Sequence, residues 1–208
     1  MKKSSFDIVP MVLEDIPIAV EIHQATFPGF FLSFLGQRFL SLLYRCYVLG
    51  ISEIALTGKC NGKIVSAVLG TIQPHGFYRR LATRHFIQFT LASLPPLLSN
   101  PSIIRRLTRA FFYRGDMPAD FSDSALLASV CTYPEFQDKG YGTAMVTYFE
   151  NEVWRRGCSR IYLVTDRIDN EPAQKFYEKL GWNVHSEFTT PEGRSMLRYW
   201  KQVGGREI

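Results

Sequence analysis

The chain has 208 residues, of which 46% are hydrophobic, and a formal net charge of +5 at pH 7. This size and composition favour one globular domain with a substantial core, and there is no apolar run of about eighteen residues such as a transmembrane helix needs. The basic N-terminus is not followed by an apolar stretch, so we expect no secretory signal. The four cysteines have no metal-ligand spacing and are expected to be reduced thiols of a cytosolic protein: Cys46, Cys60, Cys131 and Cys158.

The N-terminal part of the chain predicts a strand, two helices and a hairpin. Residues 6–11 (FDIVPM) are interpreted as a first strand, and the acidic turn and early Pro17 that follow predict a helix over 13–27. Apolar residues at helical spacing predict a second helix over 32–49. Residues 53–72 alternate on both sides of an Asn-Gly pair, which is typical of a β-hairpin.

Residues 76–118 are basic and interrupt this order. They predict two or three helices, broken at Pro95-Pro96 and at Pro101, with arginines among aromatic residues. Nine Lys or Arg and no Asp or Glu lie between Ile54 and Gly115, whereas the rest of the chain has fifteen basic and nineteen acidic residues. This concentration of positive charge in one segment indicates an anionic partner. Nucleic acid, a phosphorylated small molecule and an acidic membrane surface are all compatible with it.

The C-terminal part predicts strands that alternate with helices. A strand over 124–132 is followed by a glycine turn and a helix, then by a strand over 159–166, a helix over 170–181 and a strand pair around 190–193. Alternation of this kind, with hairpins at both ends of the chain, indicates an α/β or α+β sheet of mixed strand direction.

The glycine turn QDKGYGTAM places Gly140 and Gly142 where a strand leads into a helix. A helix N-terminus presents unpaired N–H groups that attract phosphate, and glycine lets the backbone approach an anion closely. Met145 stands where a dinucleotide fingerprint needs its third glycine, and no GK[ST] follows, so neither that fingerprint nor a Walker A loop matches. On its own, the turn could equally be a plain tight turn into a helix.

Two motifs in order resemble the GNAT superfamily of N-acetyltransferases. That family carries Q/R-x-x-G-x-G/A at the head of its central helix and N-x-x-A-x-x-F-Y-x-x-x-G-F/W further on. The positions that match here are Gln137, Gly140, Gly142, Asn170, Ala173, Phe176, Tyr177, Gly181 and Trp182. The resemblance covers roughly residues 126–182; the N-terminal part agrees only in the order of its elements, and 76–118 departs from the compact family plan.

The resemblance implies the fold of a single domain over residues 1–208. The expected fold class is α/β (α+β), with a GNAT-like mixed, splayed central β-sheet flanked by helices. The arginine-rich segment 76–118 is then a helical insertion between the third and fourth strands. Whether the protein is a monomer or a homodimer stays open.

The same resemblance implies acetyl-CoA as co-substrate and no metal. Backbone N–H groups from Asp138 to Thr143 would hold the CoA diphosphate, and Val130 to Thr132 would pair with the pantetheine arm as an added strand does. Asn170 would contact that arm and is also a plausible N-cap. The expected cofactor-binding residues are Val130, Cys131, Thr132, Asp138, Lys139, Gly140, Tyr141, Gly142, Thr143, Asn170 and Phe176.

Acetyl transfer needs a neutral amine, a polarised thioester carbonyl and a proton for the departing sulfur. The resemblance makes Tyr177 the general acid, although its helical spacing also suits a core aromatic. Thr165 stands where many family members carry a glutamate, so Asp166 is the candidate catalytic carboxylate, acting through a water, binding the substrate ammonium, or merely ending a strand. His23 and His75 are alternative bases, and Cys131 is disfavoured as an acyl carrier because direct transfer is the habit of the family.

The acceptor is the least defined part. Seven arginines of the insertion could meet acceptor phosphates by bidentate contacts: Arg79, Arg80, Arg84, Arg105, Arg106, Arg109 and Arg114. Residues 27–44 are also similar to GNAT enzymes associated with bacterial surface polysaccharides. The hypothesis is therefore an anionic small-molecule acceptor, the primary amine of a nucleotide- or lipid-linked amino sugar.

Other acceptors and other roles fit the same residues. A protein or peptide amine, another small amine, and a non-catalytic CoA-binding module are the alternatives to an amino-sugar acceptor. The insertion could also contact a membrane surface or cover the sheet with its arginines in solvent. No nucleic-acid partner is expected, because no DNA- or RNA-reading motif is present. A cytoplasmic location is expected, at the inner face of the membrane if the insertion binds lipid.

Overall fold

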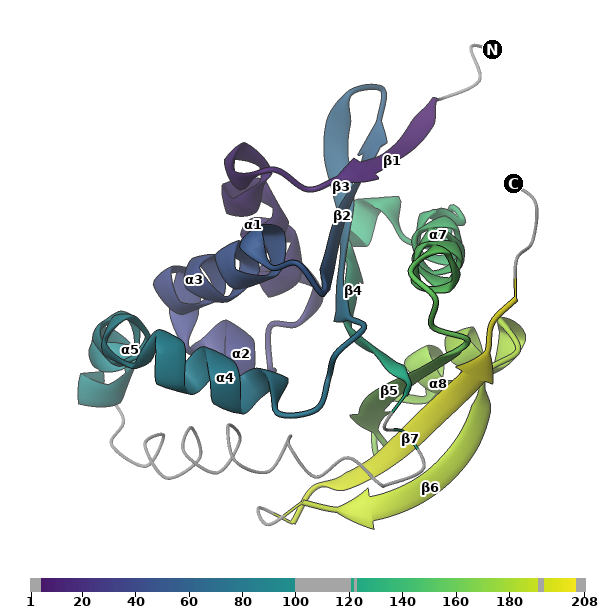
Figure 1. The fold of residues 1–208 in the computed structure, drawn as a ribbon. Helices are drawn as coiled ribbons and strands as arrows, with labels where there is room; N and C mark the ends of the chain where they lie inside the picture. Colours follow the sequence, from purple (N-terminus) through teal and green to yellow (C-terminus); the bar gives the residue numbers. More distant parts are fainter. Residues whose placement is uncertain (1–4, 100–120, 122, 191–192, 205–208) are drawn as a thin grey trace.

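The computed structural model describes residues 5–99, 121, 123–190 and 193–204. At its centre the described residues form a seven-stranded sheet in the order β1-β2-β3-β4-β5-β7-β6, with helices on both faces (Figure 1). Neighbouring strands are antiparallel except β4 and β5, which are parallel. The expected mixed α/β sheet flanked by helices is confirmed.

The N-terminal elements follow the predicted order. They are β1 (Phe6–Pro10), the short 3-10 helix η1 (Leu13–Asp15), α1 (Ile16–Thr26), α2 (Phe31–Phe34), α3 (Gly36–Leu49), β2 (Glu53–Cys60) and β3 (Lys63–Thr71). The predicted second helix is split into α2 and α3, because Gly36 has a φ of +84° and interrupts the helix. Asn61 and Gly62 have φ values of 49° and 80°, as the predicted two-residue hairpin turn requires.

Two helices lie between the third and fourth strands, as expected for the insertion. They are α4 (Phe77–Arg84) and α5 (Phe86–Ser99), and the break between them is at His85. The predicted break at Pro95-Pro96 is wrong, since α5 runs through both residues. Proline removes a hydrogen bond to the carbonyl four residues earlier, but its fixed φ is compatible with a helix. Pro101 and the rest of the segment to residue 118 lie outside the described ranges.

The C-terminal elements carry both motifs. They are β4 (Ala125–Thr132), the short 3-10 helix η3 (Pro134–Phe136), α7 (Tyr141–Arg155), β5 (Arg160–Asp166), α8 (Glu171–Lys179), β6 (Asn183–Thr189) and β7 (Ser195–Gln202). Apolar side chains pack the sheet on both faces. Phe39, Leu40 and Tyr44 are buried on the face of α1 and α3, and Met145 and Phe149 are buried under α7 on the other (Figure 1).

The sheet splits between its two parallel strands. β4 pairs with β5 only at Ala125↔Ile161 and Leu126↔Tyr162. Beyond these pairs β4 follows β3 as far as Thr132, whereas β5 follows β7 as far as Asp166. Residues 128–130 are consequently only half-buried, although β4 is a central strand. The splay that the resemblance implied is therefore present, and it opens between the carboxyl ends of β4 and β5.

Candidate functional site

The end of β4 has an open backbone edge. The Tyr133 N–H donates to the Val65 carbonyl at 3.0 Å, and the register pairs Cys131 with Ala67. Hydrogen-bonded positions alternate along an antiparallel pair, so the Cys131 backbone is used within the sheet. Val130 and Thr132 direct their N–H and C=O groups to the opposite edge, from which β5 has diverged.

One group on this open edge already has partners. The Thr132 carbonyl accepts a hydrogen bond from Gln137 Nε2 at 3.1 Å and from Thr26 Oγ1 at 3.0 Å. Gln137 thus ties the glycine turn to the strand end, a structural role that its place in the motif did not indicate. Among the described residues, the N–H and C=O of Val130 and the N–H of Thr132 also face this edge and are available to a ligand.

The glycine turn has the geometry of an anion site. Asp138 and Gly140 have φ values of 59° and 82°, so the backbone curves through the left-handed region twice. Gly140 is the N-cap of α7, no side chain caps the helix there, and its first turn contains no acidic residue. The N–H groups of 141–143 precede the first intrahelical donor, Ala144, and point out of the helix end. A phosphate would meet these donors and the positive end of the helix dipole.

Two side chains of the turn are occupied elsewhere. Lys139 Nζ donates to the Glu135 carbonyl at 2.6 Å. The centroid of the Tyr141 ring lies 4.4 Å from that of the Phe6 ring, and the Tyr141 hydroxyl lies 3.3 Å from Cys60 Sγ. The turn therefore offers mainly backbone groups to a ligand.

Gly142 brings the three predicted parts of the site together. A Cβ atom at this position would lie 3.6 Å from Phe176 Cζ in α8 and 3.9 Å from Thr132 Oγ1 in β4. The absence of a side chain at Gly142 therefore keeps space open between the turn, the strand end and the second motif.

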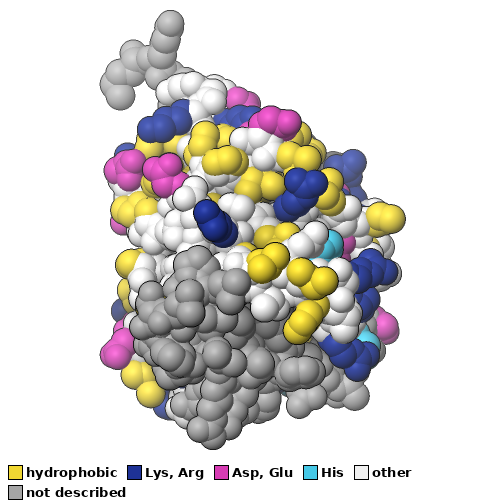
Figure 2. All heavy atoms as spheres, turned by 90° about the vertical axis from the view of Figure 1, so that its left-hand side faces the viewer, with side chains coloured by type: hydrophobic (Ala, Val, Ile, Leu, Met, Phe, Trp, Pro, Cys, Tyr) yellow, Lys and Arg dark blue, Asp and Glu magenta, His cyan; other side chains and the backbone are white. Residues whose placement is uncertain are grey.

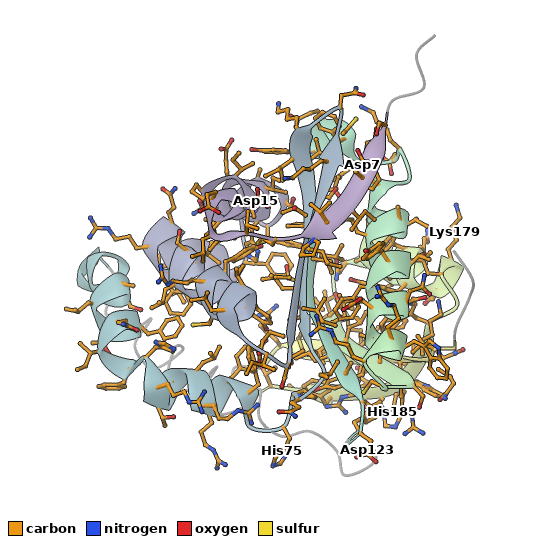
Figure 3. The ribbon with its side chains drawn as sticks, turned by 45° about the horizontal axis from the view of Figure 1, so that its top comes forward. Asp7, Asp15, His75, Asp123, Lys179 and His185 are labelled. Carbon is orange, nitrogen blue, oxygen red and sulfur yellow. The ribbon has the colours of Figure 1, made fainter. Side chains whose placement is uncertain are left out.

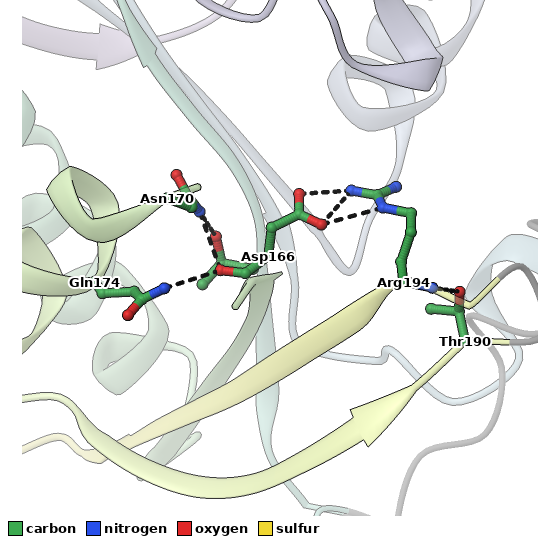
Figure 4. Close-up of polar contacts among 6 residues, drawn as sticks. Asp166, Asn170, Gln174, Thr190 and Arg194 are labelled. Atoms are coloured by element: carbon green, nitrogen blue, oxygen red, sulfur yellow. Dashed lines mark hydrogen bonds and ion pairs between the residues drawn. The ribbon is translucent and has the colours of Figure 1, made fainter. Parts of the chain in front are cut away.

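Asn170 holds α8 against the end of β5 (Figure 4). Its Nδ2 donates to Thr165 Oγ1 at 2.6 Å and to the Asp166 carbonyl at 3.3 Å. Gln174 Nε2 reaches the same carbonyl at 3.3 Å and that of Arg167 at 2.8 Å. Asn170 is the N-cap residue of α8, as expected, although its side chain makes no capping hydrogen bond.

Tyr177 is half-buried at the other end of α8. Its ring centroid lies 5.7 Å from that of Trp182 and 6.1 Å from that of Tyr199, so it packs with the core as the simpler interpretation expected. Within the described ranges its hydroxyl has no hydrogen-bond partner. Burial raises the pKa of Tyr177 well above its usual value, so the hydroxyl keeps its proton at neutral pH and can act as a donor.

Asp166 is engaged by an arginine that sequence reasoning missed (Figure 4). Arg194, from the turn between β6 and β7, donates through Nη2 to both carboxylate oxygens, at 2.7 Å and 2.5 Å, and through Nε at 3.1 Å. A bidentate guanidinium occupies the lone pairs that a base would use. The pair instead ties the β6–β7 turn to the end of β5, and no motif in the sequence links two residues this far apart.

The remaining candidate groups are His23, Cys131 and His75. His23 is buried, and its Nδ1 lies 3.1 Å from the Tyr44 hydroxyl, which lies 3.9 Å from Cys131 Sγ. Burial raises the pKa of the Cys131 thiol to about 12, so it stays protonated and weakly nucleophilic. His75 is exposed at the periphery of the molecule (Figure 3).

The described part of the chain lacks two further features. No group of three or more His, Cys, Asp or Glu side chains in it has an arrangement that could hold a metal ion. None of its helices is both long enough and apolar enough to cross a membrane.

Known proteins resemble this chain in sequence and in fold. Residues 109–182 match the model of the Acetyltransferase (GNAT) family. The match covers about a third of the chain, which is therefore similar to this family over these residues. Over 61 residues it is 36% identical to the [ribosomal protein bS18]-alanine N-acetyltransferase of Haemophilus ducreyi, a match that covers 29% of this chain and 41% of that relative. The chain therefore spans less than half the length of this relative.

Two solved structures of acetyltransferases share the fold over nearly the whole chain. The ribosomal-protein-S18-alanine N-acetyltransferase of Escherichia coli superposes with a TM-score of 0.56 at 16% identity, over 98% of this chain and 97% of that one. The protein yncA from Salmonella typhimurium, solved with its cofactor acetyl-CoA, has a TM-score of 0.61 at 12% identity, over 98% and 96%. At these identities the likeness establishes the shared fold.

Proposed function

We propose that this chain is a single-domain N-acetyltransferase that moves the acetyl group of acetyl-CoA directly to a primary amine. One observation carries the proposal: the open edge of β4, the uncapped N-terminus of α7 and Phe176 meet around Gly142. A backbone edge, a phosphate-binding helix end and an unfilled space suit the amide-bearing arm and the diphosphate of one ligand.

Different residues bind different parts of acetyl-CoA in this proposal. Backbone N–H groups of the turn, from Asp138 to Thr143, hold the diphosphate. Val130 and Thr132 pair with the amides of the pantetheine arm, and the Phe176 ring and Asn170 flank it. The Cys131 backbone and the Lys139 side chain have partners within the protein. We therefore do not include them among the groups that bind acetyl-CoA. When bound, acetyl-CoA supplies the activated acetyl group.

Tyr177 and the β4 edge carry the chemistry in this proposal. The Val130 N–H, directed into the splay, polarises the thioester carbonyl. As the amine nitrogen bonds to the acetyl carbon and the carbon–sulfur bond breaks, the protonated Tyr177 hydroxyl would give its proton to the sulfur, and the proton that the amine loses would pass to solvent, from which the hydroxyl is reprotonated. Asp166 positions Arg194 and the β6–β7 turn beside the splay, and we do not assign the base to it, because both of its oxygens accept from Arg194.

For the acceptor, a protein or peptide amine is our first candidate. The relatives that match are named for acetylation of an alanine of a ribosomal protein. A nucleotide- or lipid-linked amino sugar is the second candidate and rests on the arginines of the insertion. Arg80 is bound to the carbonyls of Gln73 and His75, and Arg105, Arg106, Arg109 and Arg114 lie outside the described ranges.

An acceptor panel tests the proposal. The protein is incubated with acetyl-CoA and, separately, a peptide that begins with alanine, a peptide whose only amine is a lysine side chain, and a nucleoside diphosphate amino sugar. Thiol release and the mass of each product are recorded. We expect acetyl transfer to the peptide N-terminus. Binding of acetyl-CoA without transfer to any amine would leave a CoA-binding module instead.

A further inference from the structure

A cavity lies outside the proposed acetyl-CoA site, between α3 and α4. Its volume is about 370 Å³, within the range of small-molecule pockets. Leu42, Phe77 and Leu81 form an apolar part of the lining, and Arg45, Arg80 and Arg84 contribute three guanidinium groups. No residue of the open β4 edge, the glycine turn or α8 lines it, so the proposed acetyltransferase site does not account for the cavity.

The three arginines differ in how they are held. Arg80 is anchored, because its guanidinium donates to the carbonyls of His75 and, at 2.9 Å, of Gln73. Arg45 and Arg84 are exposed, and within the described ranges no hydrogen bond or ion pair engages either guanidinium. Glu53 is the one carboxylate among the described residues of the lining, so positive charge exceeds negative charge there.

Part of the cavity lining is apolar. Phe77 and Leu81 are 2% and 7% exposed, and both belong to the amphipathic helix α4. The helical face of the molecule shows hydrophobic and basic side chains side by side (Figure 2). A guanidinium rim over an apolar floor is complementary to a ligand with an anionic head and a short hydrocarbon tail.

We propose that this cavity binds a small anionic amphiphile, a phosphate monoester or a carboxylate with an alkyl tail. The head pairs with Arg45 and Arg84 beside the anchored Arg80, and the tail packs on Leu42, Phe77 and Leu81. An anionic partner was expected from the basic middle of the chain, and in this proposal it binds in the cavity. It does not depend on the proposed acetyltransferase activity.

Calorimetric titration with octyl phosphate, below its critical micelle concentration, tests the site. We expect one octyl phosphate per chain and weaker binding of inorganic phosphate, which lacks the tail. Arg45→Glu combined with Arg84→Glu should weaken octyl phosphate binding by about tenfold or more, the loss of charge-assisted contacts. Arg79→Glu is the matched control, since Arg79 is exposed on the same helix and does not line the cavity, and it should change the affinity by less than about twofold.

Further arms separate this site from other anion-binding surfaces. Saturating CoA should leave octyl phosphate binding intact, and the double variant should bind CoA as the unaltered protein does. Circular dichroism checks its fold, and Arg84→Gln replaces it if it is unfolded. The proposal is overturned if octyl phosphate does not bind, if CoA displaces it, or if the arginine variants bind it equally well. Sedimentation with phosphatidylglycerol vesicles without octyl phosphate binding would assign the arginines to a membrane surface and also overturn it.

Discussion

Gly142 at the start of α7 and Phe176 in α8 face each other across the candidate site, with 3.6 Å between a Cβ built on Gly142 and the Phe176 ring. Gly142 and Gly140 are needed for different reasons. Gly140 has a φ of 82° and open space around it, so its backbone conformation demands glycine. The conformation of Gly142 suits any residue, and what glycine preserves there is space beside Phe176 and Thr132.

Substitutions at Gly142 should therefore act by size. A Cβ there makes only ordinary van der Waals contacts, so Gly142→Ala should leave the Kd for CoA within about threefold. Gly142→Val should raise it by about tenfold or more, because its methyl groups fill the space between the turn and α8. Calorimetric titration with CoA measures both. Gly29→Val, where a Cβ would meet no atom within 4 Å, is the control.

Tyr177→Phe removes the proposed proton donor and keeps the packed ring. We expect kcat to fall by about 10²-fold or more, the usual contribution of a general acid, with little change in the Kd for CoA. Tyr148→Phe is the matched control, since Tyr148 is a half-buried tyrosine packed against the same core cluster. Steady-state kinetics with an identified acceptor decide the matter. Undiminished turnover of Tyr177→Phe would remove Tyr177 from the catalytic role.

Asp166 and Arg194 should behave as one unit. If their pair only positions the β6–β7 turn, Asp166→Ala, Arg194→Ala and the double variant should raise the KM for the acceptor by similar amounts. The pH dependence of kcat should be the same in all three. If Asp166 is instead the base, Asp166→Ala should lower kcat far more than Arg194→Ala does.

A mostly buried ion pair supports the orientation of α8. Lys201 Nζ lies 2.8 Å from both oxygens of Glu150 and donates to the Leu180 carbonyl at 2.7 Å, while Trp182 Nε1 donates to Glu150 at 2.9 Å. Lys201→Met should destabilise the protein by about 3–5 kcal/mol, because it leaves the Glu150 charge unpaired. Adding Glu150→Gln should recover part of the loss. Glu152→Gln, which weakens the more exposed pairs with Arg155 and Arg156, should cost about 1 kcal/mol or less in urea unfolding.

Stability should fall at alkaline pH because of buried acids. The Cys131 thiol has a pKa of about 12 in the folded chain against an ordinary value of 9.0. Above pH 9 the unfolded chain releases this proton and the folded chain keeps it, so the stabilisation is complete below pH 9 and is lost as the pH rises toward 12. Between pH 8 and pH 10 the loss is about 1.4 kcal/mol. Urea unfolding should show a shallower decline for Cys131→Ala.

The local patterns predicted most of the elements because each is encoded by neighbouring residues. The Asn61-Gly62 turn and the amphipathic helix that follows Gly140 are examples. The split of β4 from β5 was implied only by the resemblance, since strand pairing depends on residues far apart in the sequence. The pairing of Asp166 with Arg194 had no signal at all: single charged residues predict no specific partner.

The insertion shows where local rules mislead. Two adjacent prolines predict the end of a helix, yet α5 continues through Pro95 and Pro96. Tertiary packing decides where such a helix ends. Phe89 of α5 is buried, and its ring centroid lies 4.9 Å from that of Phe39 in α3. The cavity between α3 and α4 was equally beyond prediction, because its arginines come from two helices.

The central claim is that the β4–β5 splay and the N-terminus of α7 together hold acetyl-CoA. Titration of ¹⁵N-labelled protein with CoA, followed through the backbone amide resonances, tests it most directly. We predict that the largest shifts fall on Val130, Thr132 and residues 140–143, and that they are lost in Gly142→Val. Shifts confined to α3 and α4, or no shifts at all, would contradict the account.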